Sequence, residues 1–541
     1  MFMKRWCFLC TISIGFFIVH TTHAKPKASD EKSTNKKTVE VKKGTKVDIS
    51  AEILQGGKGE RGAYQCLQGN AVFILEDVTI YADRAVYYND EEIIEAEGAV
   101  KIVQKDGTII TANALIYDKA RGIAKLFGGV VYESEDVKFY TDNFDYNVNT
   151  ERGVFKDGGM LVNKENTLTS KSGYYDNKNK MASFSDDVEL FNNDYRLECK
   201  NLTYDITTKI AKFNGHTTIT NKENDKTFST DCGGEYNTRT KQASSKRGVF
   251  DAKEYVIHGD VIKFDDEKGL VKITGGVSLI AKDSDVVIMG DYCEYRKSED
   301  VAELYGNALM TKALNDDILY MSADVFWAKG GNNAGNTQES NLEVSAGKNV
   351  KFYKTDLQGK ADHMVYKEKD EKIYLEGTPV FWNYDNQLSA NSAYVTFKNK
   401  EISEMHMDSN AFFIFRDKLE NFNQLKGKEM IAYFAKNNIT HMTIDGNADT
   451  LYFFVDDNNE LKGYNSLQCS KIVINMHDGN IDKIQFPVKS HGVFYPLDKS
   501  EEPRPKLINF NWRISERPTR KDVVEHEYGK VSDFEQFKIV N

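Results

Sequence analysis

The side chains that most often do chemistry are scattered along this 541-residue sequence without a recognisable catalytic spacing. No Gly-x-Ser-x-Gly, His-Glu-x-x-His, P-loop or Gly-x-Gly-x-x-Gly motif occurs in a suitable context. The acidic run at 456–459 (DDNN) has calcium-binding character, but it lacks the glycine and terminal glutamate of an EF-hand loop. A solvated hairpin turn is the favoured interpretation. We predict no catalytic residue, no metal site and no cofactor, and we do not expect an enzyme.

One acidic residue recurs in phase with a sequence repeat, and this regularity argues for a structural role. Aspartate side chains hydrogen-bond local backbone groups at bends, so we predict that these residues support turns. The recurring aspartates are Asp83, Asp142, Asp260, Asp291 and Asp362.

Charge and cysteine content narrow the class of protein further. The chain carries 82 acidic and 71 basic side chains, a net charge of −11, which speaks against nucleic acid as a partner because such binding needs a basic surface. Five cysteines follow residue 24, widely spaced and without a Cys-x-x-Cys pair. One or two disulfides are compatible with this spacing, but we expect most of the thiols to be small core residues. The five are Cys66, Cys199, Cys232, Cys293 and Cys469.

The first 24 residues have the pattern of a cleavable secretory signal. Lys4 and Arg5 precede an apolar run at 7–19 (CFLCTISIGFFIV), and Thr22-His23-Ala24 is an acceptable cleavage site. The run is shorter than the roughly 20 residues that span a bilayer, so a lasting anchor is the weaker interpretation. Residues 25–48 are polar and Lys-rich, and we predict a disordered linker there.

Most of the remaining chain repeats itself with a period near 30 residues. An aromatic residue marks each unit, and a glycine follows many of these rings eleven residues later, as Gly98 and Gly128 do. The marker rings are Tyr87, Tyr117, Tyr146, Tyr175, Tyr204, Tyr236, Phe264, Tyr295, Trp327 and Tyr366.

The side-chain pattern inside a unit predicts bent β-strands. Apolar and small residues alternate at a spacing of two, then three, then two, as in Ile80, Ala82, Ala85 and Tyr87. Side chains alternate faces along a strand, so the step of three marks a bulge or corner, here at Asp83-Arg84. Such a unit buries its apolar face only when copies stack. We predict an all-β fold, an elongated β-jellyroll or sandwich built from two consecutive jellyroll segments. The interval 420–435 is the only candidate for a helix, and a weak one.

Composition suggests where these segments begin and end. Repeats fill residues 49–328, and a polar Gly/Asn-rich loop or linker follows at 329–345. A second, less regular repeat segment occupies 346–500. Residues 501–541 contain three of the seven prolines, and we predict an irregular C-terminal tail.

The repeat resembles that of the OstA/LptA family, which includes LptA and the N-terminal domain of LptD. The resemblance rests on phased copies of one unit, and further segments resemble the longer OstA-like proteins of Bacteroidetes-type bacteria. The units include ADRAVYYN (82–89) with EAEGAVKI (95–102), TANALIYD (111–118) with AKLFGGVV (124–131), and KNLTYD (200–205) with AKFNGHTTI (211–219). The further segments are 51–73, LKGKEMIAYF (425–434), IDGNADTLYFF (444–454) and NFNWRISERP (509–518).

The resemblance implies a periplasmic lipopolysaccharide-transport protein, peripheral to the outer membrane at most. It implies a jellyroll that holds lipid A acyl chains inside and docks edge to edge with LptC-, LptA- or LptD-like proteins or with itself. Interior residues become lipid-contact candidates on this ground alone, since any single one is more often plain core. The candidates are Ile80, Tyr87, Ile110, Tyr117, Leu126, Phe139, Tyr146, Phe155, Leu168, Tyr175, Phe184 and Phe213.

Two other functions remain open from the sequence. A structural or adhesive repeat protein at the cell surface would have the same periodicity around a filled, dry core. An assembly partner of an LptD-like barrel would dock without carrying lipid. Accessible apolar volume and bound lipid distinguish the transport protein from both.

Overall fold

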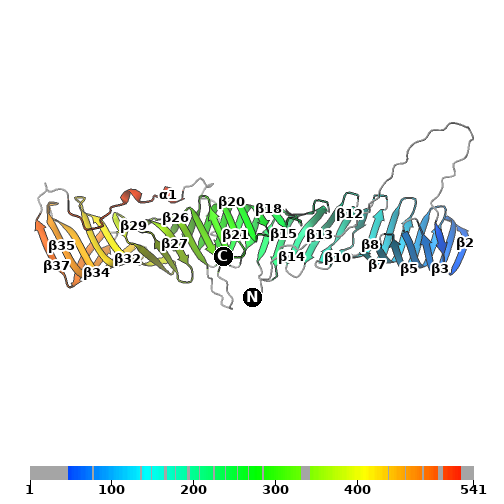
Figure 1. Cartoon of the computed structure of the whole chain (residues 1–541), viewed down its shortest axis with the longest axis horizontal. Helices are drawn as coiled ribbons and strands as arrows, with labels where there is room; N and C mark the ends of the chain where they lie inside the picture. Colours follow the sequence, from blue (N-terminus) through cyan, green and yellow to red (C-terminus); the bar gives the residue numbers. More distant parts are fainter. Residues whose placement is uncertain are drawn as a thin grey trace, which may run out of the picture. The chain divides into compact units, whose positions relative to one another are not determined.

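A computed structural model of the chain confirms the predicted all-β fold class: strands make up 75% of the described residues and helices 2% (Figure 1). The structure describes residues 47–524 except 76–77, 106, 135–136, 148, 151, 164–166, 177, 192–194, 206, 223–225, 238, 253, 266, 283–284, 331–341, 436–437, 457, 478–479 and 497–503. The predicted signal at 1–24, most of the linker, most of the loop at 329–345 and the tail beyond 524 lie outside this part.

The chain divides into two compact units. Unit 1 comprises Met1–Lys246 with Asp265–Glu267, and unit 2 comprises Arg247–Phe264 with Lys268–Asn541. The predicted boundary at 329–345 falls within unit 2, between two strands that pair with each other, Val325 opposite Gly347. The division into jellyroll segments at that loop stays a prediction.

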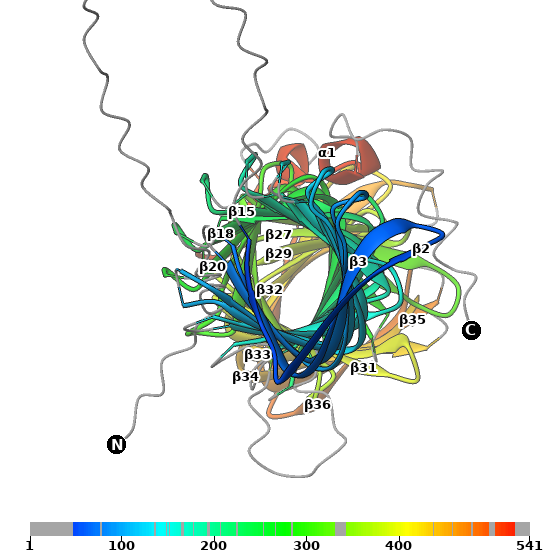
Figure 2. The same ribbon diagram turned by 90° about the vertical axis from the view of Figure 1, so that its right-hand side faces the viewer.

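Unit 1 is built of antiparallel strands; from β3 to β8 each pairs with its neighbour in sequence, whereas further along short strands also pair across a neighbour, as β8 does with β10 and β9 with β12. Its curved strands follow one another behind β2 and β3 (Figure 2). The strands are β1 (Asp48–Ser50), β2 (Ile53–Gly59), β3 (Gly62–Ile74), β4 (Val78–Tyr88), β5 (Ile93–Gln104), β6 (Ile109–Asp118), β7 (Ile123–Ser134), β8 (Val137–Asn147), β9 (Arg152–Phe155), β10 (Gly159–Asn163), β11 (Thr167–Ser170), β12 (Ser172–Asp176), β13 (Met181–Phe191), β14 (Tyr195–Asp205), β15 (Ile210–Asn221), β16 (Thr227–Thr230) and β17 (Gly234–Asn237), and β18 (Gln242–Asp251) crosses the division in sequence.

Unit 2 continues the same pattern with longer strands toward its C-terminus. The 3₁₀ turn η1 (Ile514–Glu516) and helix α1 (Arg520–Val524) follow the last strand. The strands are β19 (Tyr255–Asp265), β20 (Leu270–Ala281), β21 (Val286–Arg296), β22 (Val301–Tyr305), β23 (Leu309–Ala313), β24 (Ile318–Ser322), β25 (Val325–Lys329), β26 (Glu343–Lys354), β27 (Leu357–Lys367), β28 (Lys372–Glu376), β29 (Val380–Asn383), β30 (Asn386–Ser389), β31 (Ser392–Lys398), β32 (Glu401–Arg416), β33 (Phe422–Ala435), β34 (Asn438–Val455), β35 (Leu461–His477), β36 (Asn480–Val488) and β37 (His491–Pro496).

The interval considered for a helix is strand β33, and the α-helix lies instead at 520–524. In β33, Leu425, Met430 and Ala432 are buried between two antiparallel neighbours. Pairing on both sides stabilises the extended chain there, whatever the local preference of the sequence.

Each long strand bends near its middle, as the change of phase predicted. In β4 the register shifts between Tyr81 and Arg84, and in β5 it shifts between Glu97 and Val100. The second bend contains two consecutive left-handed residues, Gly98 (φ +76°) and Ala99 (φ +42°). One 30-residue unit therefore contains two bent strands, and the sequence pattern had revealed only the bend at the aspartate.

The recurring aspartates lie at these bends, and four of the five, all but Asp142, face a glycine across the sheet. A Cβ atom on Gly98 would overlap the carboxylate of Asp83. Gly275, Gly306 and Gly377 face the other three in the same way. This contact across strands explains why glycine follows the aspartate at a fixed distance in the repeat. The pairs are Gly275 with Asp260, Gly306 with Asp291 and Gly377 with Asp362.

An Asp or Asn directly after five of the marker tyrosines closes the next hairpin turn. Its side-chain oxygen accepts a hydrogen bond from the backbone N–H three residues later, one of the local backbone bonds for which turns favour Asp and Asn. The acceptors are Asp118 for Arg121 (2.9 Å), Asn147 for Thr150 (2.9 Å), Asp176 for Asn179 (2.8 Å), Asp205 for Thr208 (3.0 Å) and Asn237 for Thr240 (3.0 Å).

After its last strand the chain returns over the outer face of unit 2 as a segment that we call the C-terminal strap, residues 504–524 (Figure 1). Three glutamines of the sheet bind it, so an irregular segment is fixed without joining the sheet. The bonds are Leu507 N–H to Gln424 Oε1 (2.8 Å), Arg513 N–H to Gln387 Oε1 (2.6 Å), Gln387 Nε2 to Asn511 O (2.7 Å) and Arg517 Nε to Gln358 Oε1 (2.8 Å).

Apolar contacts hold both ends of the strap. Val523 and Val524 of α1 pack against Met289 and Leu309. Near the other end, the Phe422 ring lies 5.2 Å from that of Trp512. The strap thus covers apolar side chains on the outer face of unit 2, which the repeat pattern predicts to face solvent.

The bend geometry makes a stability prediction. Gly98→Ala is expected to destabilise unit 1 by about 1–3 kcal/mol. The added methyl group would overlap the Asp83 carboxylate, and the left-handed backbone would be strained for a residue with a side chain. Gly129→Ala is the matched control, since Gly129 is also left-handed (φ +59°) but has open space around its Cβ position. Urea unfolding and hydrogen exchange of β4 and β5 measure the difference. Equal losses in the two variants would contradict the proposed contact with Asp83.

Candidate functional site

The interior of unit 1 is organised as rows of side chains that run from strand to strand. In one row every marker tyrosine lies opposite a smaller residue of the next strand. Large and small side chains thus alternate along the row, which runs without interruption from β4 to β14. The row is Tyr87, Ile94, Tyr117, Ala124, Tyr146, Gly153, Tyr175, Ala182 and Tyr204.

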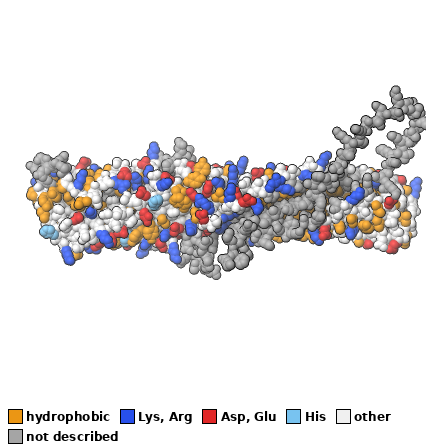
Figure 3. Space-filling view, in the orientation of Figure 1, with side chains coloured by type: hydrophobic (Ala, Val, Ile, Leu, Met, Phe, Trp, Pro, Cys, Tyr) orange, Lys and Arg blue, Asp and Glu red, His pale blue; other side chains and the backbone are white. Residues whose placement is uncertain are grey.

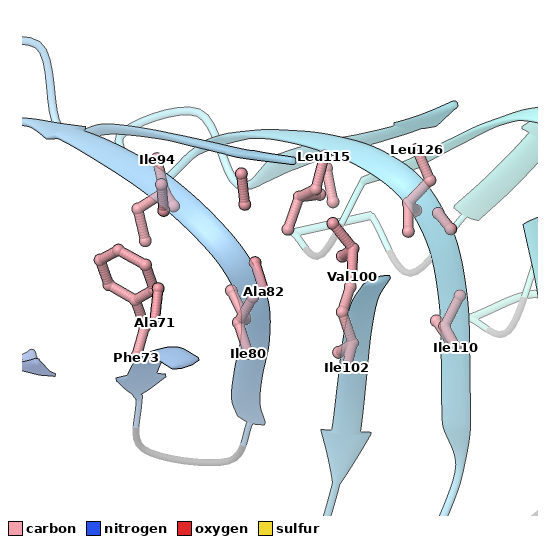
Figure 4. Packing of buried hydrophobic residues seen from close by; sticks show 14 of the residues in the cluster. Ala71, Phe73, Ile80, Ala82, Ile94, Val100, Ile102, Ile110, Leu115 and Leu126 are labelled. Carbon is pink, nitrogen blue, oxygen red and sulfur yellow. The ribbon is translucent and has the colours of Figure 1, made fainter. Parts of the chain in front are cut away.

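Both arms of each bent strand contribute to this interior. Figure 4 shows Ile94, Leu115 and Leu126 facing Phe73 and Ile110 from the other side. All five are at most 4% exposed, so the middle of the interior is packed by the protein's own side chains. Tyr87, Tyr117 and Tyr146 pack against the edge of this cluster and are only partly buried.

An aromatic chain continues the interior into the next strands. Phe139 contacts Phe144 (6.0 Å between ring centroids) and Phe155 (5.0 Å), and Phe155 contacts Phe184 (6.4 Å). Gly153 lies beneath the Phe144 ring, where a Cβ atom would collide with it. The rings thus form one connected apolar surface across β8, β9 and β13.

The structure places all twelve lipid-contact candidates on the inner face, but in two classes. Seven are buried, and five are partly exposed and therefore reachable by a ligand. Whether any of them touches lipid stays a prediction. The buried residues are Ile80, Ile110, Leu126, Phe155, Leu168, Phe184 and Phe213, and the partly exposed ones are Tyr87, Tyr117, Phe139, Tyr146 and Tyr175.

The electrostatics of this interior favour neutral groups. Burial, helped by the nearby Asp118 carboxylate, raises the pKa of Tyr117, so its phenol is neutral at physiological pH. Burial likewise raises the pKa of Cys199 and Cys293 to about 12. The five described cysteines are all free thiols.

The face seen in Figure 3 carries charged side chains of both signs, with apolar ones between them. Ion pairs also link neighbouring strands, including Arg84 with Glu97 (2.6 Å) and Lys272 with Glu294 (2.7 Å). Such exposed pairs contribute little stability each, about 0–1 kcal/mol, but they keep the outer face in water.

The acidic run that resembled a calcium loop has the geometry of a hairpin turn. Asp456 Oδ1 accepts hydrogen bonds from the backbone N–H groups of Asn458 (3.0 Å) and Glu460 (2.8 Å). Lys462 lies 3.0 Å from the other carboxylate oxygen. Within the residues that the structure describes, no three His, Cys, Asp or Glu side chains are grouped to hold a metal ion.

Sequence reasoning missed a buried charge inside unit 2. Lys312 of β23 is 8% exposed and donates a hydrogen bond to the hydroxyl of Tyr366 (3.2 Å). Its ammonium also lies 5.4 Å from the centre of the Phe397 ring. Lys312 occupies a position without a fixed residue type in the repeat, so only its break with the apolar alternation could have revealed it.

Comparison with known families identifies part of this architecture. Residues 45–200 match the OstA-like protein family. That segment contains β1 to β13 and part of β14, and all the lipid-contact candidates except Phe213. No curated protein has significant sequence similarity to the chain.

The match confirms the resemblance within residues 45–200, and for the later repeats the resemblance stays a prediction. The OstA-like family is a transport and binding family of the cell envelope, linked to lipopolysaccharide transport, rather than an enzyme family. No helix in the described portion of the chain is long and apolar enough to cross a membrane.

The buried lysine predicts a pH dependence of stability. Burial lowers the pKa of Lys312 below its usual 10.5, so the folded state loses a proton before the unfolded state does as pH rises. The charge of Lys312 therefore costs stability at neutral pH, and this cost disappears as pH rises toward 10.5.

Lys312→Met is expected to be more stable than the wild type at pH 7, with the difference shrinking as pH approaches 10.5. Urea unfolding at several pH values measures this. Lys398→Met, at the exposed end of β31, is the control and should show no such convergence. A pH-independent difference for Lys312→Met would contradict the prediction.

Proposed function

We propose that this protein binds lipopolysaccharide in the periplasm and carries it toward the outer membrane. In this proposal the signal-like segment at 1–24 directs export, and the acyl chains of lipid A lie along the inner face. The protein is passive, and an ATP-driven machine elsewhere supplies direction. No residue acts as a catalyst.

The continuous tyrosine row of unit 1 is the observation that carries this proposal. Its partly exposed rings, Tyr87, Tyr117, Tyr146 and Tyr175, border a packed apolar interior within the OstA-like segment. An acyl chain gains about 0.8 kcal/mol for each CH₂ that leaves water, so a multi-chain lipid needs such an unbroken apolar path. Tyrosine suits its border because the ring is apolar and the hydroxyl remains hydrated.

The proposed partners dock through the open edges of the sheets. In the described part of unit 1, β2 pairs with β3 alone, and every β2 residue is exposed. Ile53 and Leu54 are 50% and 55% exposed there. In unit 2, β37 pairs with β35 alone and exposes Phe494 and Tyr495. Unpaired apolar edges invite another strand, so we propose that LptC-, LptA- or LptD-like proteins or a second copy add here.

A structural scaffold with a dry core is the second candidate. The full burial of Leu67, Phe73 and Ile94 favours it, because these side chains fill the middle of unit 1 without a ligand. Lipid transport then requires either binding along the tyrosine border or a separation of the two arms. Detection of bound lipid distinguishes the candidates.

The transport proposal predicts crosslinks from the inner face to lipid A. Protein 25–541, purified without detergent, is expected to carry lipid A species detectable by mass spectrometry. A photo-reactive residue in place of Tyr117 or Tyr146 should crosslink to them, because both rings are partly exposed on the inner face.

Ile116 is the matched control position, since it neighbours Tyr117 but faces outward and is 38% exposed. A photo-reactive residue there should not crosslink to lipid. Protein that carries no lipid and fails to bind added lipopolysaccharide would leave the scaffold as the better account.

The edge proposal predicts a charge-sensitive association. Leu54→Arg is expected to weaken self-association at least fivefold in sedimentation velocity, because strand addition would desolvate the new charge. Ile116→Arg, on a strand that is paired on both sides, should leave self-association unchanged. A wild-type protein that remains monomeric at high concentration would rule out addition of a second copy.

A further inference from the structure

The last strands of unit 2 enclose a hollow of about 790 Å³ that differs from the apolar interior of unit 1. Phe415 and Tyr452 line it together with Ile481 and Ile484 of the edge strand β36. Tyr384, 44% exposed, and Phe454, 49% exposed, also line it, so it communicates with solvent. Its volume lies within the ~300–1,000 Å³ typical of ligand sites.

Polar side chains occupy the inner wall of this hollow, where the repeat pattern would place apolar ones. Asn423, Thr450 and Asn465 line it together with the aromatic rings. Asn423 is fixed by a hydrogen bond from Phe453 N–H to its Oδ1 (2.7 Å). The rings of Phe415 and Tyr452 lie 6.2 Å apart, so aromatic faces and amide groups share one wall.

One of these polar groups lacks a partner. Thr450 is 1% exposed, and its hydroxyl has no hydrogen-bond partner among the described residues. Leaving such a group unsatisfied costs about 1–3 kcal/mol, so native structures rarely retain one without a reason. The hydroxyl has almost no exposed surface in the free protein, so a ligand hydroxyl in the hollow would satisfy it after a turn of the Thr450 side chain about its Cα–Cβ bond.

The rim of the hollow is electrically balanced. Three acidic side chains face three basic ones, so no net field attracts a phosphate or another anion. Neutral ligands with many hydroxyl groups match such a mixture of carboxylates, amides and aromatic rings. The rim residues are Asp385, Asp417 and Asp482 with Arg416, Lys418 and Lys483.

We propose that this hollow binds a neutral sugar, with the pyranose ring against Tyr452 and Phe415 and a sugar hydroxyl on Thr450. The inference rests on the proposed function in one respect, that the sugar arrives as the headgroup of an acylated lipid. A free oligosaccharide has the same chemistry, and the test separates the two sources.

Saturation-transfer NMR on the full mature chain provides the test, with maltose and dodecyl maltoside as probes and dodecanoate and inorganic phosphate as comparisons. Binding of the maltoside with contacts to its sugar protons is the expected result. Binding by maltose as well would show that the sugar suffices, and binding by the maltoside alone would assign the site to glycolipids.

Thr450→Val is expected to weaken maltoside binding about fivefold or more without loss of stability, because it removes only an unpaired hydroxyl. Thr443→Val, on the outer face of the same strand, is the matched control and should bind as the wild type does. Unchanged affinity in Thr450→Val, no sugar contacts, or equal binding of dodecanoate would overturn the proposal. Crosslinking of lipid at Tyr117 would survive each of these results, so the proposed function is tested separately.

Discussion

The reversal of side-chain phase at the strand bend is the constraint on which the rest of the structure depends. A straight strand presents alternate residues to one face, and a bend without a change of phase would turn the apolar side of one arm outward. Two left-handed residues at the bend, such as Gly98 and Ala99, absorb the extra residue and keep both arms apolar on the inside. The aspartate of the neighbouring strand then fits only against a residue without a side chain.

Most other features follow from this bend. Because both arms face inward, each strand adds one residue to the tyrosine row, large and small in alternation, and stacking extends the row strand by strand. The turn acceptor that follows five of the marker tyrosines, such as Asp118, fixes the hairpin and therefore the register of the next strand. A repeat of this kind has no natural end, which leaves strands such as β2 with an unpaired edge.

The sequence predicts the repeated part of this structure because each repeated residue has one local task. The alternation around Tyr87 and Tyr117 sufficed for the all-β class and for the bend at the aspartate. The strap was beyond such reasoning, since Gln387 binds a segment more than a hundred residues away and occurs at no fixed phase. The hollow around Thr450 and the buried charge of Lys312 were also missed, because both are departures from the repeat rather than parts of it. Ligand contact depends on how far the two arms can separate, a property that neither periodicity nor burial determines.

The central claim is that an acyl chain lies along the inner tyrosine row. Structure determination of the protein bound to lipopolysaccharide, by crystallography or electron microscopy, tests it most directly. The account predicts acyl density that runs from Tyr87 past Tyr117 toward Tyr175, with the inner rings turned aside to admit it. An interior that stays filled by its own side chains, with lipid density absent or confined to the charged outer face, would contradict it.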